Sequence, residues 1–183
     1  VEVVSLRQVH GGPHIAAFEA VARVGESSVT LTYALRAGEP WLEIGVDADW
    51  FERGGPDVGV PSLRMRFPAA LTDARGRYET PGGWIERDLA AGGEPVPGIR
   101  WAEAIGRSAD GGVAACTVLN DGLYSHALEG AELSVTLLRS SYEPDPLPEL
   151  GRHTVRLGVS PRGAEPSPAG ALRLQLLDRG ARA

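Results

Sequence analysis

Hydrophobic and polar residues alternate with a period of two along most of the chain. The alternation covers residues 15–24, 29–35, 44–50 and 63–67 in the first half, and 113–119, 123–128, 133–137, 154–159 and 172–176 in the second. Side chains of a β-strand point alternately to its two faces, so this pattern predicts half-buried antiparallel strands. No segment of ten residues or more has a helical period. The sequence therefore predicts an all-β fold, an antiparallel β-sandwich of roughly a dozen strands.

Glycine and proline residues separate these strands and mark the turns. Asn120-Asp121-Gly122 lies between two apolar runs, where Asp-Gly predicts a β-hairpin. Residues 161–170 are rich in Pro, Ala, Ser and Gly without apolar periodicity, which predicts a flexible loop. The length of 183 residues fits one β-sandwich domain over residues 1–183. Because Val1 is already strand-like, we expect this domain to be excised from a longer chain.

Composition and charge exclude several classes of protein. The net charge is −6 and no run of basic residues occurs, so we expect no nucleic-acid partner. No apolar stretch reaches the roughly 18 residues of a membrane span, so we expect no membrane partner. The single cysteine, Cys116, excludes an internal disulfide, and no signal peptide opens the chain. These features predict a cytoplasmic protein, and the bias to Arg, Ala, Gly and Pro suggests a GC-rich bacterial gene.

The residues by themselves do not predict an active site or a metal site in this chain. His10 and His14 bracket a Gly-Gly-Pro turn and lack the spacing that directs two imidazoles to one ion. Cys116 lies in an apolar run with no His nearby in sequence, which favours a core residue over a nucleophile. Asp47 and Asp49 share one strand face opposite apolar residues, which is typical of a solvated face rather than of paired catalytic carboxylates.

Two stretches of the sequence resemble a known family. The first is Pro81-Gly82-Gly83-Trp84-Ile85-Glu86-Arg87, followed by Arg100-Trp101. The second runs from Val113 to Val159 and contains Leu119-Asn120-Asp121-Gly122-Leu123-Tyr124, the strand that ends in Leu138-Arg139-Ser140, Pro144-Asp145-Pro146 and Gly151-Arg152-His153. In order and spacing, these motifs resemble the C-terminal β-sandwich region of the family 38 glycoside hydrolases, the α-mannosidases.

The resemblance implies a fold and a parent enzyme. The fold would be an antiparallel sandwich of the mutarotase-like supersandwich type. The function would be that of a non-catalytic C-terminal domain of an enzyme that hydrolyses terminal α-mannosides. The catalytic barrel, with its zinc ion and aspartate nucleophile, would lie upstream in the same polypeptide. No catalytic residue, metal ligand or cofactor is therefore expected in this chain, and the isolated chain is expected to be inactive.

The resemblance also implies that Arg139 contacts the substrate. In the family, an Arg at the end of this strand lies toward the catalytic barrel, and a guanidinium can donate to vicinal sugar hydroxyls without a change of protonation. The alternative is that Arg139 pairs with Asp121, Asp145 or Glu149 and holds loops together.

Three further residues are candidates for binding a mannoside or oligosaccharide. Tyr142, Asp145 and His153 follow Arg139 on or beside a proline-rich segment, and the alternative for them is turn architecture. Trp84 and Trp101 could stack on sugar rings, although aromatic residues of sandwiches more often belong to the core. Two other functions stay open at this point: a stand-alone carbohydrate-binding module, and a purely structural interaction domain.

Overall fold

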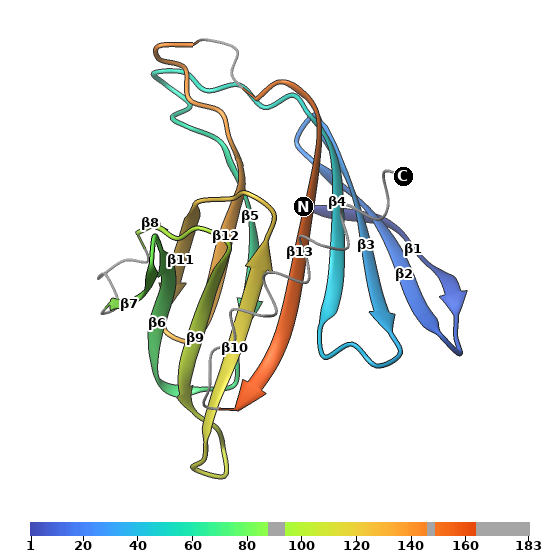
Figure 1. Ribbon diagram of the computed structural model, residues 1–183. Helices are drawn as coiled ribbons and strands as arrows, with labels where there is room; N and C mark the ends of the chain where they lie inside the picture. Colours follow the sequence, from blue (N-terminus) through green and yellow to red (C-terminus); the bar gives the residue numbers. More distant parts are fainter. Residues whose placement is uncertain (88–93, 146–148, 164–183) are drawn as a thin grey trace. The chain divides into compact units, whose positions relative to one another are not determined.

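The computed structural model describes residues 1–87, 94–145 and 149–163, and these residues form β-strands and loops without a helix. The strands are β1 (Glu2–Gly11), β2 (Ile15–Val24), β3 (Ser27–Arg36), β4 (Leu42–Trp50), β5 (Ser62–Pro68), β6 (Thr72–Thr80), β7 (Gly83–Arg87), β8 (Val96–Pro97), β9 (Trp101–Arg107), β10 (Val113–Asn120), β11 (Ser125–Glu129), β12 (Glu132–Arg139) and β13 (Gly151–Gly163) (Figure 1).

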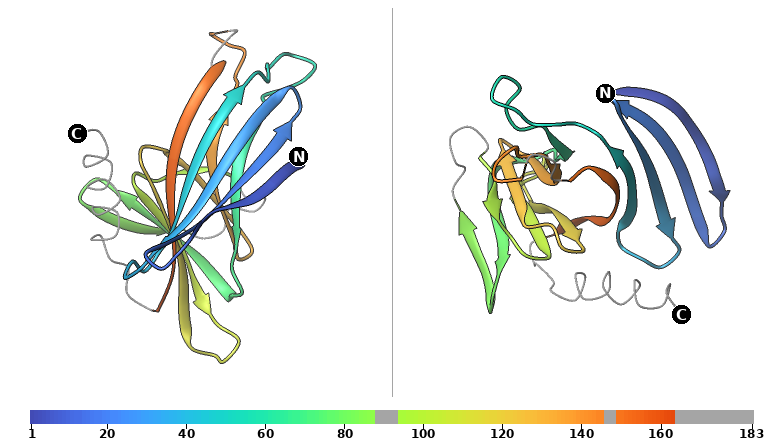
Figure 2. Two further views of the ribbon diagram at one scale, coloured as in Figure 1. Left: turned by 90° about the vertical axis from the view of Figure 1, so that its right-hand side faces the viewer. Right: turned by 90° about the horizontal axis from the view of Figure 1, so that it is seen from above.

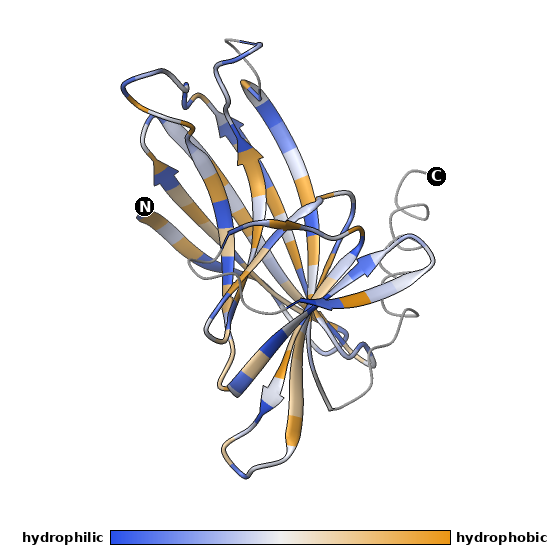
Figure 3. Ribbon diagram, turned by 90° about the vertical axis from the view of Figure 1, so that its left-hand side faces the viewer, coloured by the Kyte–Doolittle hydropathy of each residue, from blue (hydrophilic) through white to orange (hydrophobic). Residues whose placement is uncertain are grey.

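The predicted all-β fold is confirmed, and most of the predicted strands are present. β2, β3, β4, β5, β10, β12 and β13 each contain one of the alternating segments. Figure 3 shows hydrophobic and hydrophilic residues alternating along these strands. The predicted strand at 172–176 lies outside the described residues.

The chain divides into two units. The first comprises Val1–Leu63 and Leu137–Leu157, and the second comprises Arg64–Thr136 and the residues from Gly158 onward. Strands β5, β12 and β13 each cross from one unit to the other along the sequence. Whether the chain is one folding domain, as the sequence predicts, stays a prediction.

In the first unit the strand order is β1-β2-β3-β4-β13, and β1 to β4 pair as antiparallel neighbours (Figure 1, Figure 2). Directly paired residues share a face of the sheet, and one face carries apolar rows. Two of these rows are Leu6-Ala20-Leu31-Val46 and Phe18-Tyr33-Ile44. Burial declines from β4 toward β1: Val46 is 2% exposed, whereas Phe18 is 45% and Leu6 67% exposed.

The second unit is an antiparallel β-sandwich, as predicted. One sheet contains β10-β9-β6-β7 and the other contains β5-β12-β11-β8. The ring of Tyr78 from β6 lies 6.4 Å from the ring of His126 from β11, which joins the two sheets across the core. Ala102, Ala104 and Val118 share the sheet face of Tyr78, Leu128, Leu133 and Val135 share that of His126, and all six are buried.

One predicted connection is wrong. Asn120-Asp121-Gly122 does not close a hairpin, because β10 and β11 belong to different sheets. The Asn120 Oδ1 accepts hydrogen bonds from the N–H groups of Gly122 (3.0 Å) and Leu123 (2.7 Å), and so stabilises a turn that carries the chain from one sheet to the other. The hairpin of this region joins β11 to β12 instead.

The predicted flexible loop at 161–170 begins too early. Pro161–Gly163 continue strand β13. Proline lacks an N–H donor, but it is tolerated at strand positions where that hydrogen bond is not required, so Pro161 does not end the strand. The rest of the predicted loop, residues 164–170, lies outside the described residues.

Candidate functional site

Arg139 is the last residue of β12, and its side chain is exposed. The next residue, Ser140, is fully buried: its Oγ accepts a hydrogen bond from Trp50 Nε1 at 2.6 Å, and its N–H donates to the Pro61 carbonyl at 3.0 Å. Because neighbouring residues of an extended chain alternate in direction, anchoring Ser140 inside the unit leaves Arg139 outside. None of the salt bridges among the described residues of this unit involves the Arg139 guanidinium, and its role, in substrate contact or in holding loops together, stays a prediction.

The other three predicted site residues lie in the same unit as Arg139. Tyr142 is half-buried, and Asp145 is exposed. His153, on β13, lies with its Nε2 at 2.8 Å from the Glu149 carbonyl and its Nδ1 at 3.9 Å from the Glu149 carboxylate. Both of these contacts of His153 are with Glu149, and no salt bridge of the described part of the chain joins Arg139 to His153.

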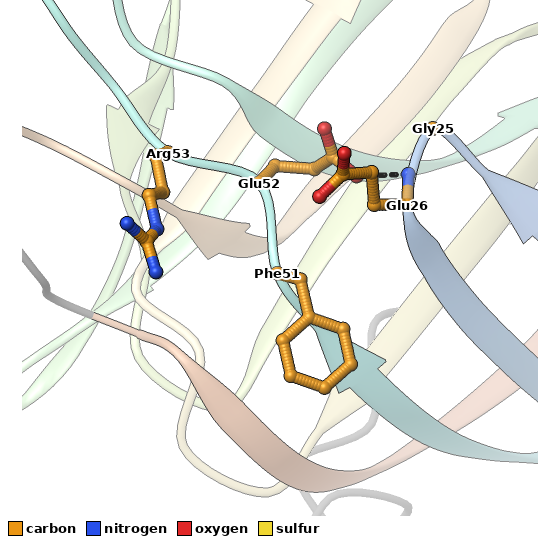
Figure 4. A pocket seen from close by; sticks show the side chains of 5 residues that line it. All are labelled: Gly25, Glu26, Phe51, Glu52 and Arg53. Carbon is orange, nitrogen blue, oxygen red and sulfur yellow. Dashed lines mark hydrogen bonds between the residues drawn. The ribbon is translucent and has the colours of Figure 1, made fainter.

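A cavity of about 650 Å³ in the first unit is lined by Gly25 and Glu26 of the β2–β3 turn and by Phe51, Glu52 and Arg53 after β4 (Figure 4). Glu52 ties the two segments together, since its Oε1 accepts hydrogen bonds from the Glu26 N–H and from the Ser27 hydroxyl, both at 2.9 Å. A Cβ at Gly25, where φ is +59°, would lie 2.5 Å from that oxygen. The positive φ therefore favours glycine at this turn.

The segment that lines this cavity continues into contact with the loop after Arg139. A Cβ at Gly54 would lie 2.5 Å from the Ser140 carbonyl oxygen and 3.3 Å from Cδ1 of Tyr142. The cavity and the predicted site therefore occupy adjoining segments, although none of the four predicted residues lines the cavity.

A second cavity, of about 520 Å³, lies in the second unit at the β6–β7 turn. Residues 79–84 and 99–101 line it, and they include both tryptophans of the first family-like stretch. Trp101 is 3% exposed and belongs to the core, whereas Trp84 is 46% exposed. Of the two tryptophans considered for sugar stacking, only Trp84 therefore has an accessible ring.

A hydrogen-bonded ion pair forms one side of this second cavity. The Glu79 carboxylate, whose residue is 5% exposed, accepts hydrogen bonds from the Arg100 N–H at 2.8 Å and from Arg100 Nε at 2.9 Å, and it also contacts Nη2. Hydrogen bonding to Glu79 raises the pKa of the Arg100 guanidinium above its ordinary value. The guanidinium is therefore held charged, and the hydrogen bonds fix both side chains in position.

The core of the second unit also contains a buried histidine. His126 is 1% exposed, and burial lowers its pKa from 6.5 to about 4. Its Nε2 lies 3.1 Å from Asn120 Nδ2. Since the Asn120 Oδ1 already accepts two backbone N–H groups, its Nδ2 is the donor, and His126 carries its own proton on Nδ1. His126 is thus neutral near pH 7.

The remaining candidates for catalysis or metal binding are not assembled into a site. Among the described residues, no group of three His, Cys, Asp or Glu side chains could hold a metal ion. Burial raises the pKa of the Cys116 thiol, and the nearby Glu103 raises it further, so the reactive thiolate is disfavoured. Asp47 and Asp49 are exposed, and Asp47 accepts a hydrogen bond from Thr154 at 2.8 Å. No described residues form a helix of the length and apolarity needed to cross a membrane.

Sequence reasoning missed the two carboxylates that organise the cavities. Glu52 follows the predicted strand that ends at Trp50, and its partner Ser27 lies 25 positions away. Glu79 precedes the recognised Pro81–Arg87 stretch, and its partner Arg100 is 21 positions away. Only the strand pairing shows that these groups meet. The one sequence signal was the recognised stretch itself, which contains Trp84 and is followed by Arg100.

Comparison with known proteins identifies the family. The model of the glycosyl hydrolases family 38 C-terminal domain matches residues 2–147, and the chain belongs to this family. The resemblance seen in the motifs is thereby confirmed. No curated protein matches the chain.

Two solved structures from Enterococcus faecalis share the fold. One is described as a protein in the glycosyl hydrolase family 38 (TM-score 0.65, 13% identity, 87% of this chain covered) and the other as an alpha-mannosidase from strain V583 (TM-score 0.68, 13% identity, 88% covered). The chain spans only 22% of the length of each of these proteins.

Proposed function

We propose that the chain is a non-catalytic C-terminal β-sandwich domain of an α-mannosidase, and that it packs on the catalytic domain of the same polypeptide. The family match and the similarity to an Enterococcus faecalis alpha-mannosidase support the class of enzyme. Since the chain spans 22% of that relative's length, most of the relative's polypeptide lies outside the part that this chain matches.

The observation that carries this proposal is the incompletely covered apolar face of β1, β2 and β3. Val3 and Leu6 on β1 are 68% and 67% exposed, Phe18 on β2 is 45%, and Leu35 on β3 is 53%. Exposed apolar surface of this extent on neighbouring strands is typical of a face that another part of the protein covers. β1 is also the end strand of its sheet, and uncovered end strands tend to pair with other chains.

The opposite face of the same strands carries charged side chains. Arg7 and Glu19 form an ion pair at 2.7 Å, and Arg36 pairs with Glu43 at 3.0 Å. Both pairs lie at register positions opposite to the apolar rows. This contrast favours the apolar face, and not the charged one, as the surface that contacts the catalytic domain.

Arg139 is the residue that we assign to the sugar pocket. Its side chain is exposed and takes part in none of the salt bridges among the described residues of this unit, and the buried Ser140 fixes the strand end behind it. Such a donor group can bind vicinal hydroxyls of a mannoside that the catalytic domain presents. Tyr142, Asp145 and His153 remain weaker candidates, because nothing in the described residues directs them to one point.

The chemistry itself would reside elsewhere in the polypeptide. The described residues do not fit a zinc centre, so a zinc ion would be held by the catalytic domain and the isolated chain would be inactive. A cytoplasmic location also stays a prediction.

The test begins with the gene that encodes the chain. Its reading frame should also encode a catalytic domain, and the complete enzyme should hydrolyse α-mannosides. In that enzyme, Leu6→Asp should lower the melting temperature by several degrees, whereas the same change should leave the melting temperature of the isolated chain almost unaltered. The control is Glu19→Ala on the charged face, which should change neither. A reading frame without a catalytic domain, or equal effects of Leu6→Asp in both proteins, would refute the proposal.

The assignment of Arg139 is tested in the same enzyme. Arg139→Ala should lower kcat/KM for α-mannosides by about tenfold or more without changing the melting temperature, because it removes a donor to the sugar. Arg36→Ala, an exposed arginine of the same unit, is the matched control. Unchanged kinetics in Arg139→Ala would exclude the role in the pocket.

A further inference from the structure

We propose that the cavity at the β6–β7 turn of the second unit binds a neutral pyranoside, with the sugar ring stacked on Trp84. The ligand class rests on the proposed function, but the site is argued from this chain's own residues. β6 and β7 are adjacent in the sheet (Figure 1) and are joined by the turn at Pro81-Gly82.

Trp84 is held in one orientation before any ligand arrives. The Arg77 guanidinium lies 4.7 Å from the centre of the indole ring. Arg77 is itself fixed by Glu86 at 3.2 Å and by Glu103 at 3.7 Å, and the Glu103 side chain is fully buried. The cation stacks on the indole while 46% of Trp84 stays exposed. A preset aromatic ring loses little freedom on binding, which favours stacking by the C–H face of a sugar.

Arg100 supplies hydrogen-bond donors beside this ring. Glu79 pairs with Trp84 in the β6–β7 register, so its side chain and the indole share a face of the sheet. Its carboxylate holds Nε and Nη2 of Arg100. Nη1 of Arg100 has no partner among the described residues, and the side chain is 34% exposed. A fixed guanidinium with free N–H groups suits sugar hydroxyl oxygens.

The charge balance favours a neutral ligand over an anion. Glu79 neutralises Arg100, and Glu86 and Glu103 together neutralise Arg75 and Arg77. The cavity therefore offers directed donors and an aromatic ring without excess positive charge, whereas a phosphate site would need uncompensated cations or several backbone N–H groups.

The turn keeps the cavity open. Pro81 followed by Gly82, with φ of +86°, fits a type II turn, in which the second central position requires a glycine-like conformation. A Cβ at Gly82 or Gly83 would meet nothing within 4 Å, so both glycines border free space. The volume of about 520 Å³ lies within the range of small-molecule sites.

The experiment uses the chain itself and the signals of its four tryptophans. Trp41, Trp50 and Trp101 are at most 4% exposed, so Trp84 is the one tryptophan whose ring solvent reaches freely. ¹H–¹⁵N spectra that resolve the indole N–H groups are recorded while methyl α-mannopyranoside is added to millimolar concentrations. We expect a saturable shift of the Trp84 signal. Trp84→Ala should weaken binding by about tenfold or more, measured by calorimetry or by backbone shifts around Arg100.

Two controls are needed. One tests whether the loss of binding comes from the site or from a changed fold, and the other tests whether an anion binds in place of the sugar. Ile85→Ala changes the next residue, on the other face of β7, and should leave binding intact. Inorganic phosphate should not compete. The proposal is overturned if no signal shifts saturably, if Trp84→Ala binds as tightly as the parent chain, or if phosphate displaces the sugar. Because this test needs no catalytic domain, its failure would leave the proposed function untouched.

Discussion

The two units of the chain differ in how completely they bury their apolar residues. In the second unit, two sheets enclose a core in which Ala102, Leu133 and Val135 are 0% exposed. In the first unit, the apolar face is buried along β4 but becomes steadily more exposed toward β1, where no residue is buried. A sheet with one uncovered apolar face has not yet gained the free energy of burying it. The second unit therefore buries its apolar faces within itself, whereas the first leaves part of an apolar face exposed, as the proposed packing on a catalytic domain requires.

The two units also differ in whether their charged and polar groups are buried. The second unit buries Glu79, Glu103 and His126 and provides each with a hydrogen-bond partner. The ion pairs on β1 to β4 are solvent-exposed. Buried charge requires exact partners because desolvation is costly, whereas exposed pairs contribute little. Substitutions should thus be felt far more strongly in the second unit than on the first unit's outer strands.

The largest expected difference comes from leucines in the two units. Leu133→Ala should destabilise the isolated chain by about 4 kcal/mol, because it leaves a cavity in a fully enclosed core. Leu6→Ala should cost less than about 0.5 kcal/mol, since most of that side chain is already in water. Urea unfolding of both variants measures the two values. Similar losses would mean that β1 is covered within this chain, and the contrast between the units would be lost.

A smaller effect is expected from breaking ion pairs. Arg100→Met should cost about 3 kcal/mol, less than for a wholly buried pair because a third of the Arg100 side chain is exposed. The loss arises because the Glu79 carboxylate would stay buried without its main partner. Arg36→Met, in the exposed pair with Glu43, should change stability by no more than about 0.5 kcal/mol. Equal unfolding midpoints for the two variants would contradict the assignment of Glu79 as a buried charge.

The smallest of the three effects is a pH dependence specific to the second unit. His126 has a pKa of about 4 in the folded chain and about 6.5 when unfolded, so the unfolded state binds the proton more tightly. The contribution of neutral His126 to the free energy of unfolding is complete above about pH 6.5 and is lost as the pH falls toward 4. Between about pH 7 and 5 the free energy of unfolding should fall by about 2 kcal/mol. His126→Gln should remove this part of the pH dependence. Unfolding curves that fall equally with pH in both proteins would show that other groups carry it.

The outer strands of the first unit were largely predictable from the sequence. Alternation over 15–24, 29–35 and 44–50 predicted β2, β3 and β4 to within a few residues, because a half-buried strand must alternate. The exposed faces of Asp47 and Asp49 followed from the same pattern. β1, by contrast, was not delimited, since none of its residues is buried and the strand lacks the contrast between buried and exposed positions on which the pattern depends.

In the second unit, the local sequence did not predict the turn after β10 or the burial of the tryptophans. Asp-Gly after Asn120 has the composition of a hairpin turn, but the two flanking strands bury their apolar faces in different sheets. Burial of both strands outweighs the preference of the dipeptide for a hairpin, and Asn120 stabilises the alternative turn. Of the two candidate tryptophans, Trp101 is 3% exposed and Trp84 is 46% exposed, a difference that their identity and spacing do not contain.

By itself, the sequence determined the all-β class, the position of most strands and the family, because these follow from periodicity and from ordered motifs. The tertiary structure decided which groups meet. Glu79 and Arg100, Glu52 and Ser27, and Trp50 and Ser140 are 21, 25 and 90 residues apart. Pairing over such separations depends on strand order and register, which are set by how the whole chain buries its apolar faces and not by local sequence.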